Sequence, residues 1–106
     1  MKKLFFGVLT ALAMAAGGTF AGTLDDVKAR GSLLCGVSTG APGFATVDDS
    51  GKDVGFDVDY CRALAAAVFG DPMAVKFVPL SSAVRFTALA SGEVDILARN
   101  TTCLLY

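Results

Sequence analysis

Three polar segments each follow an apolar run that is long enough to form a buried strand. Their candidate binding residues are Ser38, Thr39, Ser82, Arg85, Asn100 and Thr102. Hydroxyl and amide groups can donate and accept hydrogen bonds, and a guanidinium can bind a carboxylate through two parallel hydrogen bonds. Side chains of these types predict a site for a small anionic or zwitterionic ligand.

The elements expected to position these residues alternate between strand and helix. Apolar runs predict strands at residues 32–37, 75–80 and 94–98, with helices at 57–69 and from about 82 to 91. This order predicts an α/β fold, with a mostly parallel sheet and helices on both faces. Ligands of such sheets bind outside the carboxyl ends of the strands, which is where the polar segments are expected to meet.

Two smaller elements complete the expected fold. Residues 23–30 predict a short helix that ends before Gly31. Residues 44–47 and 52–56 flank the turn-forming sequence Asp48-Asp49-Ser50-Gly51 and predict a hairpin. Within it, Phe44 is equally suited to the wall of a cleft or to the core of the hairpin.

Two predicted helix starts involve residues with a competing functional interpretation. Asp57 is predicted to be the N-cap of the 57–69 helix, accepting a hydrogen bond from the N–H of Tyr60, and ligand contact is the less favoured alternative. Ser82 is predicted to help cap the next helix. Arg85 then falls in the first turn, where the helix dipole disfavours a cation, which favours a ligand-binding role over a solvated one. For Arg99, ligand contact and a surface position are equally supported.

The first 21 residues have the organisation of a secretory signal peptide. Met1-Lys2-Lys3 is basic, residues 4–16 are apolar, and Thr19-Phe20-Ala21 provides small residues for cleavage. A buried N-terminal helix is the alternative. We therefore expect residues 1–21 to be a signal peptide and residues 22–106 to be the mature chain.

Composition excludes several classes of function for the mature chain. Without the two lysines of the leader, seven basic residues face ten acidic ones, a net charge of about −3. The mature chain lacks the basic patch that a nucleic-acid partner would require, so no such partner is expected. Histidine is absent and the three cysteines lack zinc-site spacing, so no metal or other cofactor is expected.

Four motifs occur in a characteristic order: Gly55-Phe56-Asp57-Val58-Asp59, Arg85-Phe86-Thr87-Ala88-Leu89, Ser91-Gly92-Glu93-Val94-Asp95 and Arg99-Asn100-Thr101-Thr102. Together they resemble the amino-terminal lobe of periplasmic solute-binding proteins of polar amino-acid ABC importers, and above all the general L-amino-acid subgroup. The resemblance covers residues 23–102. It implies a partial lobe of the periplasmic-binding-protein type II fold.

The resemblance also implies a function without catalysis. Proteins of this family capture one L-amino acid between two lobes in the periplasm and present it to the membrane permease subunits of the importer, and the full-length protein is expected to be a monomer. By position, Ser38 and Thr39 line the cleft, while Ser82 and Arg85 contact an acidic ligand side chain. Asn100 and Thr102 hold the α-carboxylate and ammonium groups of the ligand.

The end of the sequence departs from the family pattern. A Trp is expected where Cys103 stands, and the carboxylate-binding Arg, the hinge and the second lobe are expected beyond Tyr106. We therefore expect a fragment of an amino-acid-binding protein. An enzyme or sensor domain on the same fold, or a non-functional truncated remnant, are the alternatives.

Cys35 and Cys61 form a possible disulfide. One lies in the first predicted strand and the other in the first turn of the helix expected to pack on it, and an exported chain enters an oxidising compartment. Two buried free thiols are the alternative. Cys103 is expected to be unpaired.

Overall fold

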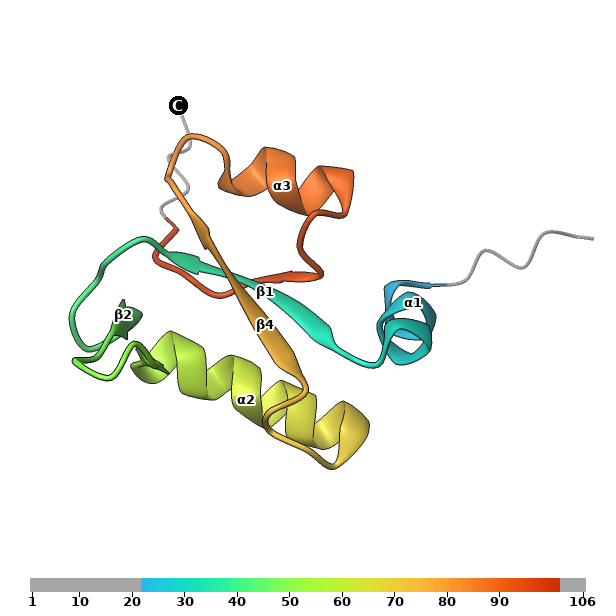
Figure 1. Ribbon diagram of the computed structural model, residues 1–106. Helices are drawn as coiled ribbons and strands as arrows, with labels where there is room; N and C mark the ends of the chain where they lie inside the picture. Colours follow the sequence, from blue (N-terminus) through green and yellow to red (C-terminus); the bar gives the residue numbers. More distant parts are fainter. Residues whose placement is uncertain (1–21, 102–106) are drawn as a thin grey trace, which may run out of the picture.

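The computed structural model describes residues 22–101, and its centre is a three-stranded parallel sheet (Figure 1). The strand order is β4–β1–β5, so β1 (Leu33–Ser38) lies between β4 (Val75–Leu80) and β5 (Ile96–Leu97). β1 pairs with β4 along its whole length and with β5 at Cys35 and Gly36. The predicted α/β fold with a parallel sheet is confirmed. The predicted signal peptide lies outside the described residues.

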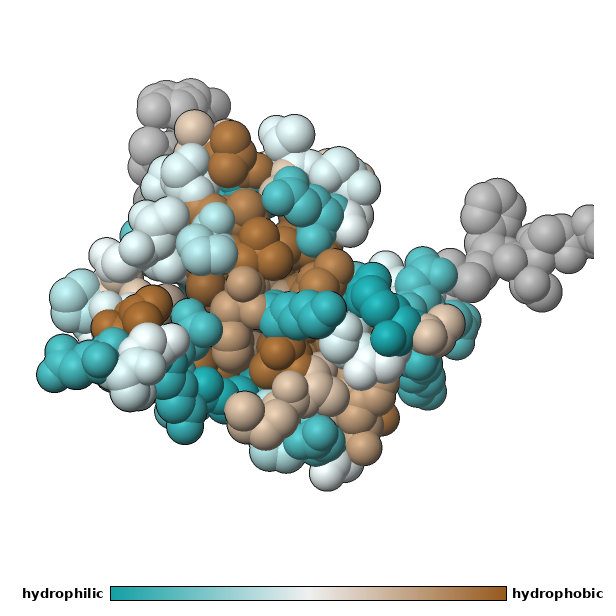
Figure 2. All heavy atoms as spheres, in the orientation of Figure 1, coloured by the Kyte–Doolittle hydropathy of each residue, from teal (hydrophilic) through white to brown (hydrophobic). Residues whose placement is uncertain are grey.

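Helices cover both faces of this sheet, as predicted. α2 (Phe56–Phe69) lies on one face and α3 (Arg85–Ser91) on the other (Figure 1). Successive side chains of a strand point to opposite faces, so each strand contributes to two apolar clusters. The cluster under α2 consists of the buried residues Cys35, Val37, Ala45, Val58 and Cys61, and the cluster under α3 of Leu80, Ala88 and Val94. In Figure 2 hydrophobic residues accordingly gather across the middle of the molecule, over β1 and β4.

The remaining elements lie at the margins of the sheet. The predicted hairpin is present but short, with β2 (Thr46–Val47) antiparallel to β3 (Asp53–Val54). α1 (Thr23–Arg30) precedes β1 and ends at Gly31, as predicted. No helix within residues 22–101 has both the length and the apolar character needed to span a bilayer.

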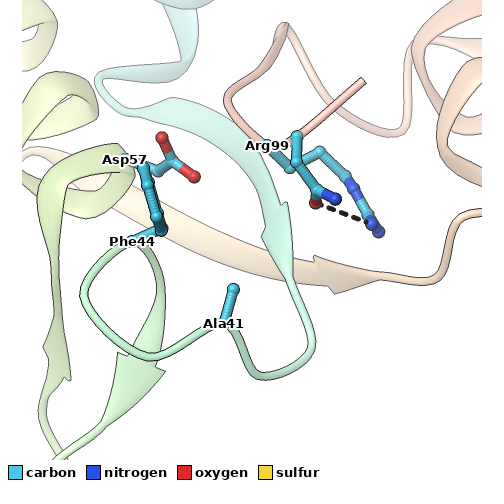
Figure 3. Close-up of a pocket in the computed structure, with 5 residues that line it drawn as sticks. Ala41, Phe44, Asp57 and Arg99 are labelled. Atoms are coloured by element: carbon cyan, nitrogen blue, oxygen red, sulfur yellow. Dashed lines mark hydrogen bonds between the residues drawn. The ribbon is translucent and has the colours of Figure 1, made fainter. Parts of the chain in front are cut away.

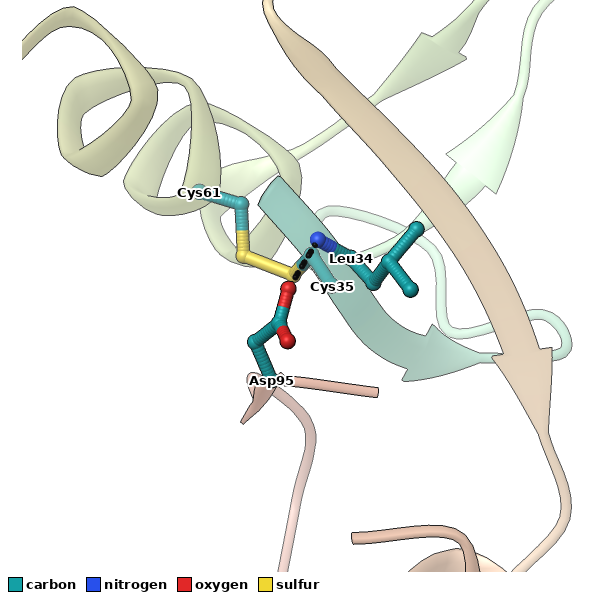
Figure 4. Close-up of a disulfide and its surroundings, with 4 residues drawn as sticks. All are labelled: Leu34, Cys35, Cys61 and Asp95. Atoms are coloured by element: carbon teal, nitrogen blue, oxygen red, sulfur yellow. Dashed lines mark hydrogen bonds between the residues drawn. A yellow bond between two sulfur atoms is a disulfide. The ribbon is translucent and has the colours of Figure 1, made fainter. Parts of the chain in front are cut away.

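Asp95 connects α1 to the sheet. Its carboxylate accepts a hydrogen bond from the backbone N–H of Leu34 at 2.7 Å (Figure 4). The same carboxylate forms an ion pair with Arg30. Its backbone N–H donates to the carbonyl of Leu34 at 2.9 Å. One acidic residue therefore fixes the start of β1 between α1 and the segment that leads into β5.

The prediction that Asp57 caps α2 is wrong. The N-cap residue is Gly55, and no side chain fills the cap. Instead, the N–H of Phe56 donates to the carbonyl of Gly43 at 3.0 Å and that of Asp57 donates to the carbonyl of Phe44 at 2.9 Å. The neighbouring loop thus satisfies the first two free N–H groups of the helix, and the carboxylate of Asp57 does not cap it.

The predicted start of α3 is wrong as well. The helix begins at Arg85, with Val84 as its N-cap residue and no side-chain cap, whereas Ser82 lies in the preceding turn. The hydroxyl of Ser82 accepts a hydrogen bond from Arg99 instead, which explains why it does not cap the helix. The third strand is also shorter than predicted, because Val94 still bonds to the carbonyl of Ala88 in the turn after α3.

Candidate functional site

The carboxyl ends of the three strands lie at one edge of the sheet, and Ser38, Thr39, Ser82 and Asn100 lie at or just after these strand ends. Ser38 is paired in register with Leu80, so the loop after β1 and the turn after β4 start side by side. On the other side of β1, the N–H of Ala98 donates to the carbonyl of Gly36 at 2.8 Å. The segment beginning at Arg99 therefore emerges next to Ser38, as the parallel topology requires.

Arg99 ties two of these strand ends together. Its guanidinium donates to the backbone carbonyl of Leu80, to the hydroxyl of Ser82 at 3.0 Å and to the side-chain carbonyl of Asn100 at 3.2 Å. Both terminal nitrogens of Arg99 are thus engaged within the protein. These contacts give Arg99 a positioning role, which differs from both roles considered from the sequence, ligand contact and a surface position.

The other predicted residues are placed around this bridge. Ser38 is half-buried at the end of β1, while Thr39, Ser82 and Asn100 are exposed. Thr102 lies outside the described residues. The structure therefore brings Ser82 and Asn100 together through Arg99 and places Ser38 beside them by strand register.

Arg85 is separate from that hydrogen-bonded group. Its guanidinium carbon lies 4.8 Å from the centre of the Phe86 ring, a cation–π contact. Its Nε is buried and has no hydrogen-bond partner within the described residues. The Nε of Arg99 is likewise buried without a hydrogen-bond partner among these residues, so this feature does not by itself assign Arg85 a ligand-binding role.

A hollow of about 380 Å³ opens beside the strand ends (Figure 3). It is lined by Ala41, Phe44, Asp57, Arg99 and Asn100. Its volume lies in the range of small-molecule sites, about 300–1,000 Å³. Phe44 is 56% exposed, which places it in the wall of the hollow rather than in a hairpin core.

Two of these lining residues were not singled out as binding residues in the sequence. Ala41 has no chemical feature that would have identified it. The sequence favours Asp57 as a helix cap, but loop carbonyls accept the first N–H groups of α2, so its carboxylate does not serve as the cap. Gly55, directly before the helix, is the sequence signal for this capping by a loop, because a glycine at an N-cap allows another backbone to approach closely.

A disulfide fixes the helix that carries Asp57. Cys35 of β1 and Cys61 of α2 are joined through their sulfur atoms, with their Cα atoms 6.3 Å apart (Figure 4). Both residues are fully buried. The bridge holds the first turns of α2 against the central strand, next to the hollow.

No three histidine, cysteine, aspartate or glutamate side chains come together within residues 22–101. The polar groups at the site are instead hydroxyls, an amide, guanidiniums and one carboxylate. Fold and site together define an α/β lobe with a candidate edge for binding a small polar molecule.

Comparison with known proteins agrees with this class. The sequence profile of the bacterial extracellular solute-binding proteins, family 3, matches residues 33–103. The chain therefore belongs to this family. The predicted resemblance to solute-binding proteins is confirmed.

Two curated relatives are similar along almost the whole chain. One is the glutamate/glutamine/aspartate/asparagine-binding protein BztA of Rhodobacter capsulatus, 59% identical over 95% of this chain. The other is the general L-amino acid-binding periplasmic protein AapJ of Rhizobium johnstonii, 58% identical over 95% of this chain. The chain spans about 30% of the length of each.

A solved structure shows the same fold. It is an ABC transporter/periplasmic binding protein from Brucella ovis with glutathione bound, 65% identical in sequence, with a TM-score of 0.74. The match covers 77% of this chain and 26% of the Brucella chain. The predicted periplasmic-binding-protein lobe is therefore confirmed as the fold of the described residues.

Proposed function

We propose that this chain forms one wall of a cleft that captures a polar or acidic L-amino acid outside the cytoplasm for an ABC importer. The observation that carries the proposal is the convergence of Ser38, Ser82 and Asn100 at the carboxyl edge of the sheet, with Arg99 joining the latter two. The names of the two curated relatives support the choice of amino acids as ligands. The chain acts by binding and not by catalysis.

The proposed roles of the site residues follow their positions. Ser38 and Thr39 line the cleft after β1. Asn100, with Thr102 two residues further on, holds the α-carboxylate and ammonium groups of the ligand. Arg85, together with Ser82, binds the side-chain carboxylate of an acidic ligand, because a guanidinium can bind a carboxylate through charge-assisted hydrogen bonds.

The proposed setting is the periplasm. Residues 1–21 act as the signal peptide, and residues 22–106 belong to the amino-terminal lobe. The partners are the L-amino acid and the permease subunits of the importer, and the protein acts as a monomer. Mass spectrometry of the exported product tests the first point: the mature chain should begin at Gly22, and a soluble product that retains Met1 would contradict it.

A second ligand class is favoured by one specific observation. The Brucella relative, at 65% identity, is described with glutathione bound. Glutathione carries the α-carboxylate and α-ammonium groups of an amino acid on its γ-glutamyl end. Asn100, the proposed partner of those groups, lines the same hollow as Ala41 and Phe44, so the remainder of such a peptide would extend from Asn100 into that hollow.

Isothermal titration calorimetry with the purified protein tests the proposal. Glutamate, glutamine, aspartate, asparagine and glutathione are titrated over micromolar to millimolar concentrations. Replacing Arg85 by Gln should weaken glutamate binding by about tenfold or more, the equivalent of one charge-assisted contact, and glutamine binding by less. Lys76, exposed on β4, provides the matched control as Lys76→Gln. Saturable heat from none of these ligands would contradict the proposal.

A further inference from the structure

α2 is apolar on its outer face as well as on the face that packs against the sheet. Val58 and Cys61 are buried on the inner face. Phe56, which is 69% exposed, and Tyr60, which is 50% exposed, lie one turn apart on the outer face, and exposed Ala63 follows one turn further. A surface helix usually carries charged and polar residues on the side that faces water. The outer face of α2 therefore has the composition of a surface that a partner covers.

The charges around this outer face are mostly negative. Residues 44–63 contain five aspartates, against one lysine and one arginine. The arginine, Arg62, is engaged within the protein, because its guanidinium donates to the backbone carbonyl of Asp53 at 2.8 Å and its side chain is only 16% exposed. Asp49 is exposed, and the side chain of Asp59 remains 74% exposed although it pairs with Arg62. Exposed rings bordered by negative charge fit a partner whose apolar surface is bordered by lysine or arginine.

The outer face of α2 begins next to the candidate ligand site. Phe56 precedes Asp57, which lines the hollow. The N–H groups of these two residues donate to the carbonyls of Gly43 and Phe44, at 3.0 and 2.9 Å, and Phe44 also lines the hollow. A partner that covers Phe56 would therefore lie beside the hollow and contact the helix end that the wall of the hollow caps.

We infer that the outer face of α2, with Phe56 and Tyr60 at its centre and aspartates at its border, is the surface through which this lobe binds a permease subunit of the importer. This inference rests on the proposed importer function. The matching surface of the permease subunit is apolar and bordered by lysine or arginine. A second copy of this chain would bring two aspartate-bordered faces together, and an anionic lipid surface would repel those aspartates, so both are disfavoured as partners.

Biolayer interferometry with the permease complex of the importer measures this contact. The complex is held in phosphatidylcholine nanodiscs, and the unmodified chain or a variant is the analyte, with L-glutamine present throughout. Phe56→Ser should weaken binding by about tenfold or more, because a central aromatic residue typically contributes this much to an interface. Met73→Ser is the matched control and should change nothing, because Met73 is 67% exposed but lies beyond Gly70, at the other end of α2.

Charge reversal at the border tests the electrostatic part of the inference. Asp49→Lys should slow association with the permease complex by about threefold or more and leave dissociation nearly unchanged, since charges at the rim of an interface act mainly on the rate of encounter. Glu93→Lys is the control. It makes the same change at an exposed position after α3, the helix on the other face of the sheet, and should leave the association rate unchanged.

The outcomes separate this inference from the proposed function. If the unmodified chain binds the permease complex and neither Phe56→Ser nor Asp49→Lys affects that binding, the inference is overturned and the proposed function stands. Equal binding to empty nanodiscs, or a dimer in analytical ultracentrifugation that Phe56→Ser dissociates, would also overturn it, because the outer face would then contact lipid or a second copy. If the unmodified chain does not bind the permease complex, the proposed importer function fails and the inference fails with it. Thermal unfolding verifies that all four variants remain folded.

Discussion

The carbonyl oxygen of Phe44 lies where the side chain of any other residue at position 55 would begin. A Cβ built on Gly55 would be 2.2 Å from that oxygen, and Gly55 itself has a φ of 126°. The loop that contains Phe44 comes this close because its carbonyls cap α2. The same contact leaves the carboxylate of Asp57 available to the hollow, so Gly55 and Phe44 connect the fold to the candidate site.

Replacing Gly55 by Ala should destabilise the protein by at least about 2 kcal/mol. The new Cβ would clash with the backbone of Phe44, and the φ of Gly55 is one that residues other than glycine rarely adopt. Urea unfolding monitored by circular dichroism measures the change. Gly40→Ala is the matched control, because a Cβ at Gly40 meets no atom within 4 Å. Equal stability of the two variants would show that the loop does not hold α2 in the described way.

Asp95→Ala should cost about 1–3 kcal/mol of stability. The substitution leaves the N–H of Leu34 without its acceptor and removes the partner of Arg30. Asp95→Asn should cost less, since an amide oxygen can still accept from Leu34. Arg30→Ala should cost at most about 1 kcal/mol, because the Arg30 side chain is 34% exposed and solvent screens the pair. The reverse order, with Arg30→Ala the most harmful in thermal unfolding, would contradict the assignment of Asp95.

The Cys35–Cys61 bridge should leave one free thiol in the chain. Alkylation of the oxidised, unfolded protein should label Cys103 alone, out of three cysteines. Reduction should lower the free energy of unfolding by about 3–4 kcal/mol, the loop-closure entropy for a sequence separation of 26 residues. Three labelled thiols in the oxidised protein would exclude the bridge.

The hairpin turn predicts one pH effect. The Ser50 hydroxyl and the Lys52 N–H donate to the carboxylate of Asp48 and hold its pKa below the ordinary value of 3.8. A lowered folded-state pKa contributes stability that is fully present above pH 3.8 and is lost as the pH falls through the lower value. Carboxyl-detected NMR titration should show Ser50→Ala raising the pKa of Asp48 towards 3.8. A pKa unchanged by that substitution would contradict the described turn.

The architecture could be predicted from the sequence because its signals are local. Apolar runs, Gly31, Gly70 and Gly92 at the helix ends and the strand–helix alternation identify the elements, and the parallel topology then follows from general rules. The meeting of Ser38 with the segments at Ser82 and Asn100 followed in turn from that topology. These residues are predictable as a group because strand ends fix their positions.

The helix starts could not be predicted because their hydrogen-bond partners are distant in sequence. Asp57 and Ser82 have the side chains of N-cap residues, but Gly43 and Phe44 cap α2, and Arg99 engages the Ser82 hydroxyl. Local preference was overridden by tertiary contact in both cases. The hollow was missed for the same reason, since its lining comes from three separate segments of the chain.

NMR mapping of bound glutamine tests directly whether the carboxyl edge of the sheet is the ligand-binding wall. Backbone amide resonances of the isotopically labelled protein are followed during the titration. Ligand binding at this edge should produce saturable shifts at Thr39, Ser82 and Asn100 and around Asp57. It should produce none at Gly31, Gly70 and Gly92, which follow the helices at the opposite edge of the sheet. Shifts confined to those three glycines, or no saturable shift with any polar amino acid or glutathione, would contradict this placement of the ligand.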